Sequence, residues 1–236
     1  MPASGDPRSG EAARCVGFLH TSAVHVEPFG ELMAEVDPSF AHRHIVRTRL
    51  LDRARAVGLE DRELHRGVRE ALVELPVAPG SVVVCTCSTI GAIAEGCGED
   101  LGLRVLRVDR PMAELAVRSG RRLAVLATLA STLAPTKALL DEAAREAGVR
   151  VTIHEVLCAD AWEAFQAGDQ VGYVERIAVH LEALEDSIEV AVLAQASMAP
   201  AAQLVTNSRP MLASPRLAVE AAVALSRVPL RRGAHP

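Results

Sequence analysis

Short β-branched or aliphatic runs alternate along the chain with longer segments in which apolar residues recur at helical spacing. The short runs predict strands over residues 15–19, 42–46, 81–86, 103–108, 121–127, 151–156 and 188–193. The helical spacing predicts helices over residues 29–35, 50–57, 60–75, 90–101, 113–118, 136–147, 162–166, 171–184 and 217–226. Strands that alternate with helices of about 10 to 15 residues indicate βαβ units and a mostly parallel sheet. About seven or eight strands fit two small sheets better than one, so we predict an α/β fold of two lobes with a cleft between the strand ends.

The stretch Val82–Gly91 (VVVCTCSTIG) carries the clearest chemical signal. A β-branched run fit for a buried strand stops at a thiol, hydroxyl groups and a glycine. In an open α/β sheet, chemistry is located at the carboxyl ends of strands, where the chain turns into the next helix. Cys87 is therefore a candidate nucleophile or proton carrier. The alternative is a pair of small buried residues, because free cysteine is among the most buried residue types.

Composition and charge narrow the class of partner. Half of the residues are hydrophobic but only 3% are aromatic, so the core must consist of Ala, Val, Leu and Ile, as is usual when helices pack on a parallel sheet. A net charge of -5 provides no basic excess to neutralise phosphates, which argues against nucleic acid as a partner. The low aromatic content also favours a compact ligand over an aryl one.

The chain shows no signal for a membrane, a disulfide framework or a metal. No apolar run reaches the roughly 18 residues that a membrane span needs, and residues 1–13 have no hydrophobic signal core and indicate a disordered leader. Five cysteines, an odd number, favour reduced thiols and a cytoplasmic location. His42 and His44 lack a third ligand at a recognisable distance, so no metal site is expected.

Four segments, in order along the chain, resemble one protein family. Cys87-Ser88-Thr89, directly after an aliphatic strand, resembles the first catalytic motif of the aspartate/glutamate/hydantoin racemase superfamily. Similar family signatures follow at residues 126–128 with 135–137, at 167–169 and at 193–198. The resemblance spans nearly the whole chain, from about residue 15 to residue 224. Each piece is short, and their order and spacing together carry the resemblance.

The resemblance implies a cofactor-independent enzyme made of two flavodoxin-like α/β lobes with parallel sheets, related by a pseudo-twofold axis. It assigns residues 14–108 and 206–230 to a first lobe that carries Cys87, and residues 109–205 to a second lobe that carries Gln195. Racemases of this family use two cysteines on opposite faces of the substrate α-carbon. One thiolate removes the proton and the opposite thiol returns one, which makes Cys87 the implied catalytic acid/base.

The second cysteine is missing. The residue at its position is Gln195, which has no proton to exchange at neutral pH, and neither Ala196 nor Ser197 restores one. Three interpretations follow. Cys87 works alone, as the single cysteine does in the arylmalonate decarboxylase branch; or another residue is the second acid/base, for which we predict His20 at the end of the first strand; or the protein binds a carboxylate without catalysis.

Polar residues at the strand ends complete the predicted site. Hydroxyl groups and helix N-termini must stabilise the thiolate and the substrate carboxylate. The residues predicted to bind substrate are Ser88, Thr89, Thr128, Ser131, Thr132, Gln195, Ala196 and Ser197. The sequence thus predicts a racemase or isomerase acting at the carbon α to a carboxylate of a small acid or amino acid, with a malonate-type decarboxylase and a non-catalytic binder as alternatives. Alanine-rich helices such as residues 139–147 offer a surface for a homo-oligomer.

Overall fold

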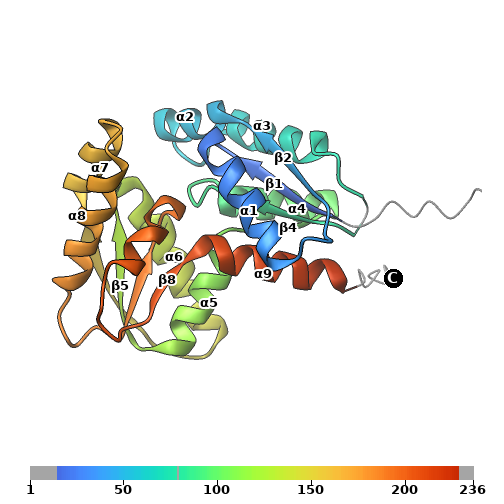
Figure 1. The fold of residues 1–236 in the computed structure, drawn as a ribbon. Coiled ribbons are helices and arrows are strands. Elements are labelled where there is room, and N and C mark those ends of the chain that lie inside the picture. Colours follow the sequence, from blue (N-terminus) through green and yellow to red (C-terminus); the bar gives the residue numbers. More distant parts are fainter. Residues whose placement is uncertain (1–14, 79, 229–236) are drawn as a thin grey trace, which may run out of the picture.

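The computed structural model describes residues 15–78 and 80–228 and shows two lobes, each built on its own parallel sheet (Figure 1). The leader predicted at residues 1–13 lies outside the described residues. The α/β fold of two lobes that the sequence predicts is confirmed. No helix in the described ranges is both long and apolar enough to cross a membrane.

The first lobe holds a four-stranded sheet in the order β2-β1-β3-β4. Its strands are β1 (Val16–His20), β2 (His42–Val46), β3 (Val82–Cys85) and β4 (Arg104–Arg107), all parallel. Its helices are η1 (Ala23–His25), α1 (Val26–Val36), α2 (Thr48–Val57), α3 (Arg62–Glu74) and α4 (Gly91–Leu101). Strand order reverses between β1 and β3, and this switch point is where open α/β sheets bind ligands.

The second lobe repeats this order as β6-β5-β7-β8. Its strands are β5 (Arg122–Ala127), β6 (Thr152–Leu157), β7 (Val190–Leu193) and β8 (Met211–Ala213). Its helices are α5 (Arg110–Ser119), α6 (Ala130–Glu146), α7 (Ala159–Gln166), α8 (Gln170–Glu182) and η2 (Ala196–Gln203). The matching strand orders make β3 and β7 equivalent strands of the two lobes.

The last helix, α9 (Ser214–Arg227), leaves the second sheet and packs on the first. Its buried residues Ala218, Val219 and Val223 share a core cluster with Phe18 of β1 and Phe29 of α1. The other face of the first sheet is covered by a separate cluster that includes residues of α3 and α4. Because both faces are covered, β3 reads as a continuous apolar run rather than an alternating one.

Two boundaries differ from the prediction. Residues 206–230 were expected in the first lobe, but β8 pairs with β7 in the second sheet, and only α9 returns to the first. A three-residue strand is too short to show a pattern in the sequence. Helix α6 begins at Ala130 instead of residue 136, with Pro135 inside it. This places Ser131 and Thr132 in the first turn of a helix.

Candidate active site

Cys87 lies in the turn that joins β3 to α4. All four residues of β3 are buried, and the next strand over, β1, is buried along its whole length. Helix α4 begins at Gly91, where a Cβ atom would lie only 2.8 Å from the Cβ of Arg107. Because Gly91 has no side chain, the start of α4 packs closely against β4. This contact holds the Cys87 turn at the carboxyl ends of the strands.

A cavity of about 350 Å³ lies between the lobes at these strand ends. This volume is within the range of small-ligand sites. Of the predicted site residues, those that line it are Cys87, Ser88, Thr89, Thr132, Gln195, Ala196 and Ser197. The structure thus brings together the residues predicted at the ends of β3 and β7, although they are about a hundred positions apart in the sequence.

Cys87 is the thiol that faces this cavity, with 9% of its surface exposed. Its neighbour Cys85 is fully buried in β3, and its thiol donates to the Cys87 carbonyl at 3.7 Å. Burial, and then the nearby Cys87, raise the pKa of Cys85 well above its usual range, so Cys85 stays a neutral thiol. Within the described ranges, Cys87 alone among the cysteines lines the cavity.

Gln195 presents a hydrogen-bond donor to the cavity. Its Oε1 accepts from the backbone N–H of Thr128 at 2.6 Å and from the Thr128 hydroxyl at 2.9 Å. A backbone N–H can only donate, so the amide oxygen must be the atom that faces Thr128. The amide NH₂ is therefore the free end of this side chain. Thr128 does not line the cavity as predicted but orients the residue that does.

Ser197, on the same wall, is paired with a residue that the sequence did not single out. Its hydroxyl lies 2.7 Å from the Tyr173 hydroxyl of α8. Burial raises the pKa of Tyr173, so the phenol stays protonated and can donate. Ser131, in contrast, is exposed on α6 and does not line the cavity, which corrects its prediction as a substrate-binding residue.

The predicted second acid/base, His20, lies behind the cavity. It is fully buried; its Nε2 lies 2.8 Å from Nδ1 of His44, and its Nδ1 lies 2.9 Å from the Thr86 hydroxyl. Burial, followed by the charge of His44, lowers the pKa of His20 to about 3. His20 does not line the cavity, and its prediction as the second acid/base is corrected. Its ring stacks with Phe18 and lies edge-on to Phe29.

His25, and not His20, is the histidine near the end of β1 that lines the cavity. It ends the short helix η1 after β1 and lines the cavity. Burial lowers its pKa below the usual value, so it is a neutral imidazole at neutral pH. The sequence offered no motif around His25, and only its position after the first strand pointed to the site.

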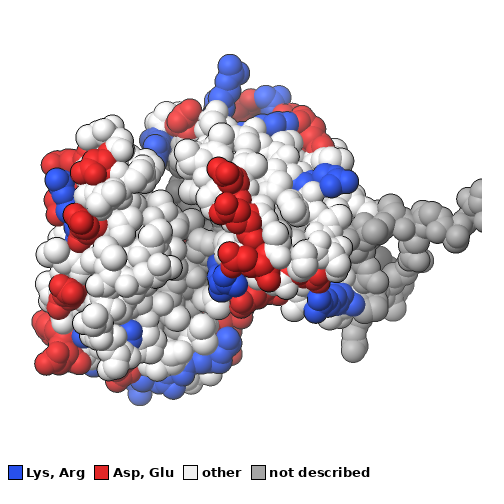
Figure 2. All heavy atoms as spheres, in the orientation of Figure 1, with Lys and Arg blue, Asp and Glu red and all other residues white. Residues whose placement is uncertain are grey.

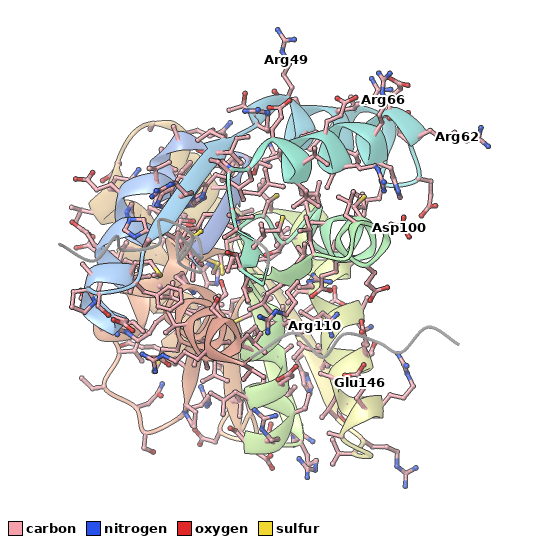
Figure 3. All side chains as sticks on the ribbon, turned by 90° about the vertical axis from the view of Figure 1, so that its right-hand side faces the viewer. Arg49, Arg62, Arg66, Asp100, Arg110 and Glu146 are labelled. Carbon is pink, nitrogen blue, oxygen red and sulfur yellow. The ribbon has the colours of Figure 1, made fainter. Side chains whose placement is uncertain are left out.

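Three further residues that line the cavity lie on helices for which the sequence analysis predicted no site residue. Arg55 of α2 is the one Lys or Arg among the described lining residues. Trp162 and Phe165 of α7 stack with their ring centroids 5.2 Å apart and form an aromatic wall. The low aromatic content of the sequence did not lead us to expect this wall. Other arginines of α2 and α3, such as Arg49, Arg62 and Arg66, point outward (Figure 3).

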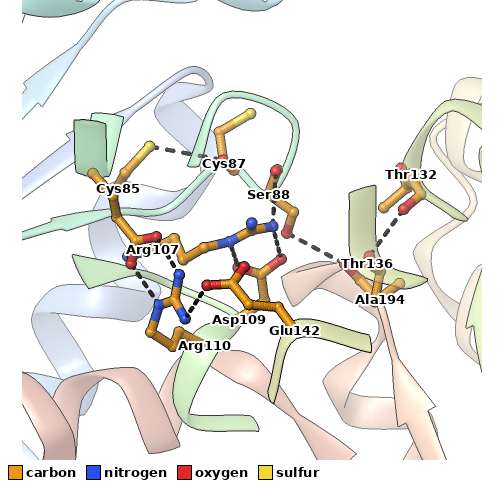
Figure 4. A network of polar contacts seen from close by, with 11 residues as sticks. Cys85, Cys87, Ser88, Arg107, Asp109, Arg110, Thr132, Thr136, Glu142 and Ala194 are labelled. Carbon is orange, nitrogen blue, oxygen red and sulfur yellow. Dashed lines mark hydrogen bonds and ion pairs between the residues drawn. The ribbon is translucent and has the colours of Figure 1, made fainter. Parts of the chain in front are cut away.

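A buried ion pair between Arg107, at the end of β4, and Asp109 supports the Cys87 turn (Figure 4). Arg107 donates to both carboxylate oxygens of Asp109, at 2.6 Å and 2.9 Å, and to the backbone carbonyl of Ser88 at 3.4 Å. The Arg107 and Asp109 side chains are 4% and 0% exposed. This bidentate contact fixes the direction of the turn, because a planar guanidinium matches a carboxylate in one geometry.

Two contacts join the lobes near the site. The Ser88 hydroxyl donates to the Ala194 carbonyl at the end of β7, at 3.5 Å. Arg110 of α5 bridges Glu95 of α4 at 2.7 Å and Glu142 of α6 at 3.1 Å (Figure 4). In the described part of the chain, no group of three or more His, Cys, Asp or Glu side chains is arranged to hold a metal ion.

Comparison with known proteins shows a shared fold. No protein-family model and no curated protein matches the sequence. The structure is similar to glutamate racemase from Francisella tularensis in complex with D-glutamate, with a TM-score of 0.65 and 14% identity over 90% of this chain and 81% of that chain. Aspartate racemase from Picrophilus torridus matches with a TM-score of 0.65 and 14% identity over 90% and 94%. A glycine-to-cysteine mutant of arylmalonate decarboxylase in a sulfate-associated form matches with a TM-score of 0.54 and 16% identity over 90% and 93%.

These neighbours are proteins of the superfamily that the sequence resembles. At such low identity, the likeness establishes the two-lobed fold. The chemistry of the site has to be argued from the residues that line the cavity.

Proposed function

We propose that this protein is a cofactor-independent enzyme of the racemase type that moves a proton at the carbon α to a carboxylate, with Cys87 as an acid/base. One observation carries the proposal: Cys87, in the turn after β3, lines a cavity between the lobes together with several hydroxyl groups, the Gln195 amide and Arg55. A thiol is able to exchange a proton with carbon only when donors stabilise the charge that moves onto the substrate carboxylate.

The lining residues can supply that stabilisation. Arg55 and the Gln195 amide are donors that suit a carboxylate, and Ser88 adds a hydroxyl beside Cys87. As the α-proton leaves, negative charge spreads onto the carboxylate oxygens, where these donors interact most strongly. The same set holds the α-carbon near the thiol, which converts the proton transfer into a step within a bound complex.

In the isomerase reaction, His25 is the second acid/base. Neutral His25 removes the α-proton and becomes an imidazolium, and the Cys87 thiol donates its proton to the other face of the resulting enediolate and becomes a thiolate. The imidazolium and the thiolate then return to their neutral forms by proton exchange with solvent. The lowered pKa of His25 supports this assignment, because the reaction begins from the neutral imidazole.

Gln195 favours a second candidate, a decarboxylase of a malonate-like acid. An amide orients a carboxylate but returns no proton, so chemistry on that side of the site need not involve proton transfer. In this reaction the bond between the α-carbon and one carboxyl group breaks, CO₂ leaves, and the Cys87 thiol protonates the enediolate from one face. His25 has no required role in it.

Product stereochemistry in D₂O separates the candidates. Single enantiomers of aspartate and glutamate, and the prochiral acid 2-methyl-2-phenylmalonate, are incubated with the protein and followed by ¹H NMR and chiral chromatography. A racemase incorporates deuterium at the α-carbon and yields both enantiomers, and H25Q abolishes this activity. A decarboxylase yields one deuterated enantiomer and tolerates H25Q. If C87A keeps either activity with an unchanged thermal melt, the assignment of Cys87 is wrong.

A non-catalytic binder gives a third result. No acid is turned over, but a carboxylate raises the melting temperature of the protein. The R55A variant then loses that shift, while R62A, an exposed arginine outside the cavity, keeps it. This result would replace the enzymatic proposal with a binding role.

A further inference from the structure

A second and larger cavity adjoins the Cys87 cavity. It has a volume of about 740 Å³ and lies between α1 of the first lobe and η2 of the second, and the start of α9 also lines it. Neither the resemblance nor the proposed reaction gives it a role. The crevice between the lobes is visible on the surface, beside α1 (Figure 2).

The two cavities meet at a neck. Five residues line both of them: Val24, His25, Phe165, Ala196 and Ser197. The neck therefore includes His25, which faces the reacting carbon in the proposed function. Val24 is 63% exposed although it is apolar, and a ligand passing through the neck would cover it.

The walls of the second cavity are mainly apolar. They include Phe29 and Leu32 of α1, Ala199 and Pro200 of η2, and Ala213 at the end of β8. Burying hydrocarbon against such walls is favourable in proportion to the area removed from water. The chemistry of these walls fits a hydrocarbon group.

The charges at the rim argue against an anionic group in this cavity. Glu31 and Glu35 of α1 lie at the rim, and Figure 2 shows acidic residues gathered along this helix. The one arginine in its lining, Arg216, is already paired with Glu35. The two glutamates would repel a carboxylate here, whereas in the Cys87 cavity Arg55 and the Gln195 amide offset the one carboxylate among the described residues of its lining, Asp52.

We propose that the second cavity holds an apolar substituent carried by the α-carbon of the substrate. The substrate is then a carboxylic acid with an extended hydrocarbon side chain, not a compact acid such as alanine or aspartate. The carboxylate binds beside Cys87, the α-carbon lies at the neck, and the substituent extends toward α1 and η2. This inference rests on the proposed function, because it assumes that the reacting carbon lies next to Cys87.

Alkylation of Cys87 by 2-bromo acids tests the inference without a known substrate. The Cys87 thiolate sulfur bonds to the α-carbon, bromide leaves, and the thiol proton goes to solvent. The full chain is incubated with 2-bromopropanoate, 2-bromohexanoate or 2-bromooctanoate, and labelling of Cys87 is followed by intact mass and peptide mapping. For each acid we compare the concentration that gives half of the maximal labelling rate. The rates are first corrected for the intrinsic reactivity of that acid with free glutathione.

We expect tighter binding as the chain lengthens. Burial of each methylene strengthens binding by up to about fourfold, so 2-bromooctanoate should reach half-maximal rate at a concentration more than about tenfold below that of 2-bromopropanoate. The variant A199F narrows the second cavity and should remove this gain while leaving 2-bromopropanoate unaffected. V179F adds the same bulk on the exposed face of α8, in neither cavity, and should change nothing.

The other outcomes separate the two proposals. Equal half-maximal concentrations for all three acids, or an unchanged chain-length gain in A199F, would overturn the substituent site and leave the proposed function intact. If none of the acids labels Cys87 with saturation, both proposals fall, since no carboxylate then places its α-carbon beside the thiol.

Discussion

The two lobes have the same backbone plan and different chemistry at equivalent positions. Cys87 lies two residues after the end of β3, and Gln195 lies two residues after the end of β7, in sheets of matching strand order. Each turn is tied to the neighbouring strand end, through Thr86 and His20 in the first lobe and through Gln195 and Thr128 in the second. The strand order is the same in both lobes, while the equivalent positions carry a thiol in the first lobe and an amide in the second.

The supports beneath the two turns also differ. In the first lobe, Arg107 at the end of β4 forms a buried ion pair with Asp109 and contacts the Ser88 carbonyl. The equivalent strand end in the second lobe is Ala213, the last residue of β8, which carries no charge. The turn that holds Cys87 is thus supported by a buried ion pair, and the turn that holds Gln195 is held by neutral hydrogen bonds.

The largest effect is expected from C87A. Removing an acid/base group that touches the substrate lowers kcat by about 10²- to 10⁴-fold. The α-proton exchange assay in D₂O measures this loss. C97A, at a cysteine that lies on α4 away from the cavity, is the matched control and should retain exchange. Equal activity of the two variants would remove Cys87 from the mechanism.

Breaking the buried ion pair is expected to have the largest effect on stability. R107M leaves the Asp109 carboxylate buried without its partner, which lowers the free energy of unfolding by about 3–5 kcal/mol. Urea denaturation measures the change, and the double variant R107M/D109L should recover much of the loss. R66A, which removes exposed ion pairs of α3, should cost less than about 1 kcal/mol. Similar costs for R107M and R66A would show that the ion pair does not brace the turn.

Acid should destabilise the first lobe more than the second. The pKa values of His20 and His44 are lowered to about 3 and about 4, chiefly by burial, from 6.5 in the unfolded chain. Both states bind no proton well above pH 6.5, and below it the unfolded chain binds protons that the folded histidines do not accept. Stability is therefore full above pH 6.5 and falls as the pH drops toward 4, by about 2 kcal/mol for His20 at pH 5.

Hydrogen exchange shows which lobe loses stability at acid pH. Amide protons of β1 and β3 should exchange faster at pH 5 than at pH 7 after correction for intrinsic rates, while those of β5 and β7 change less. H20N removes the titrating group and should flatten the pH dependence, whereas H180N, on α8 of the second lobe, should not. Equal acid sensitivity of both lobes would contradict the role of the buried histidines.

The sequence predicted the features that depend on local pattern. The β-branched run of β3 and the small polar residues after it located the Cys87 turn, and the resemblance placed Gln195 opposite. The choice between His20 and His25 depends on the direction of a side chain at a strand end. His20 follows Phe18 by two residues, so both point to the α1 face of the sheet. A five-residue hydrophobic pattern does not show closely enough at which residue the strand ends to decide this.

The residues that the sequence missed are placed by packing between distant elements. Arg55 lies on α2, whose other arginines, Arg49 and Arg53, are exposed, and residues of the second lobe complete the cavity that Arg55 lines. Trp162 and Phe165 form a wall because α7 lies opposite the end of β3, which depends on the relative position of the lobes. Composition counted few aromatic residues but could not show that two of them meet at the site.

Restoring a thiol in the second lobe tests the comparison most directly, at a modest cost in stability. Q195C leaves the Thr128 N–H without its acceptor, which lowers the free energy of unfolding by about 1 kcal/mol. If Gln195 orients the carboxylate from the position that an acid/base would occupy, the new thiol should deliver a proton to the face opposite Cys87. The single enantiomer that the decarboxylase candidate forms should then become a mixture in the D₂O assay. Q195N, which keeps an amide at that position, is the control and should leave the product stereochemistry unchanged. An unaltered product from Q195C would show that the α-carbon does not lie between the two turns, and that the second lobe contributes binding alone.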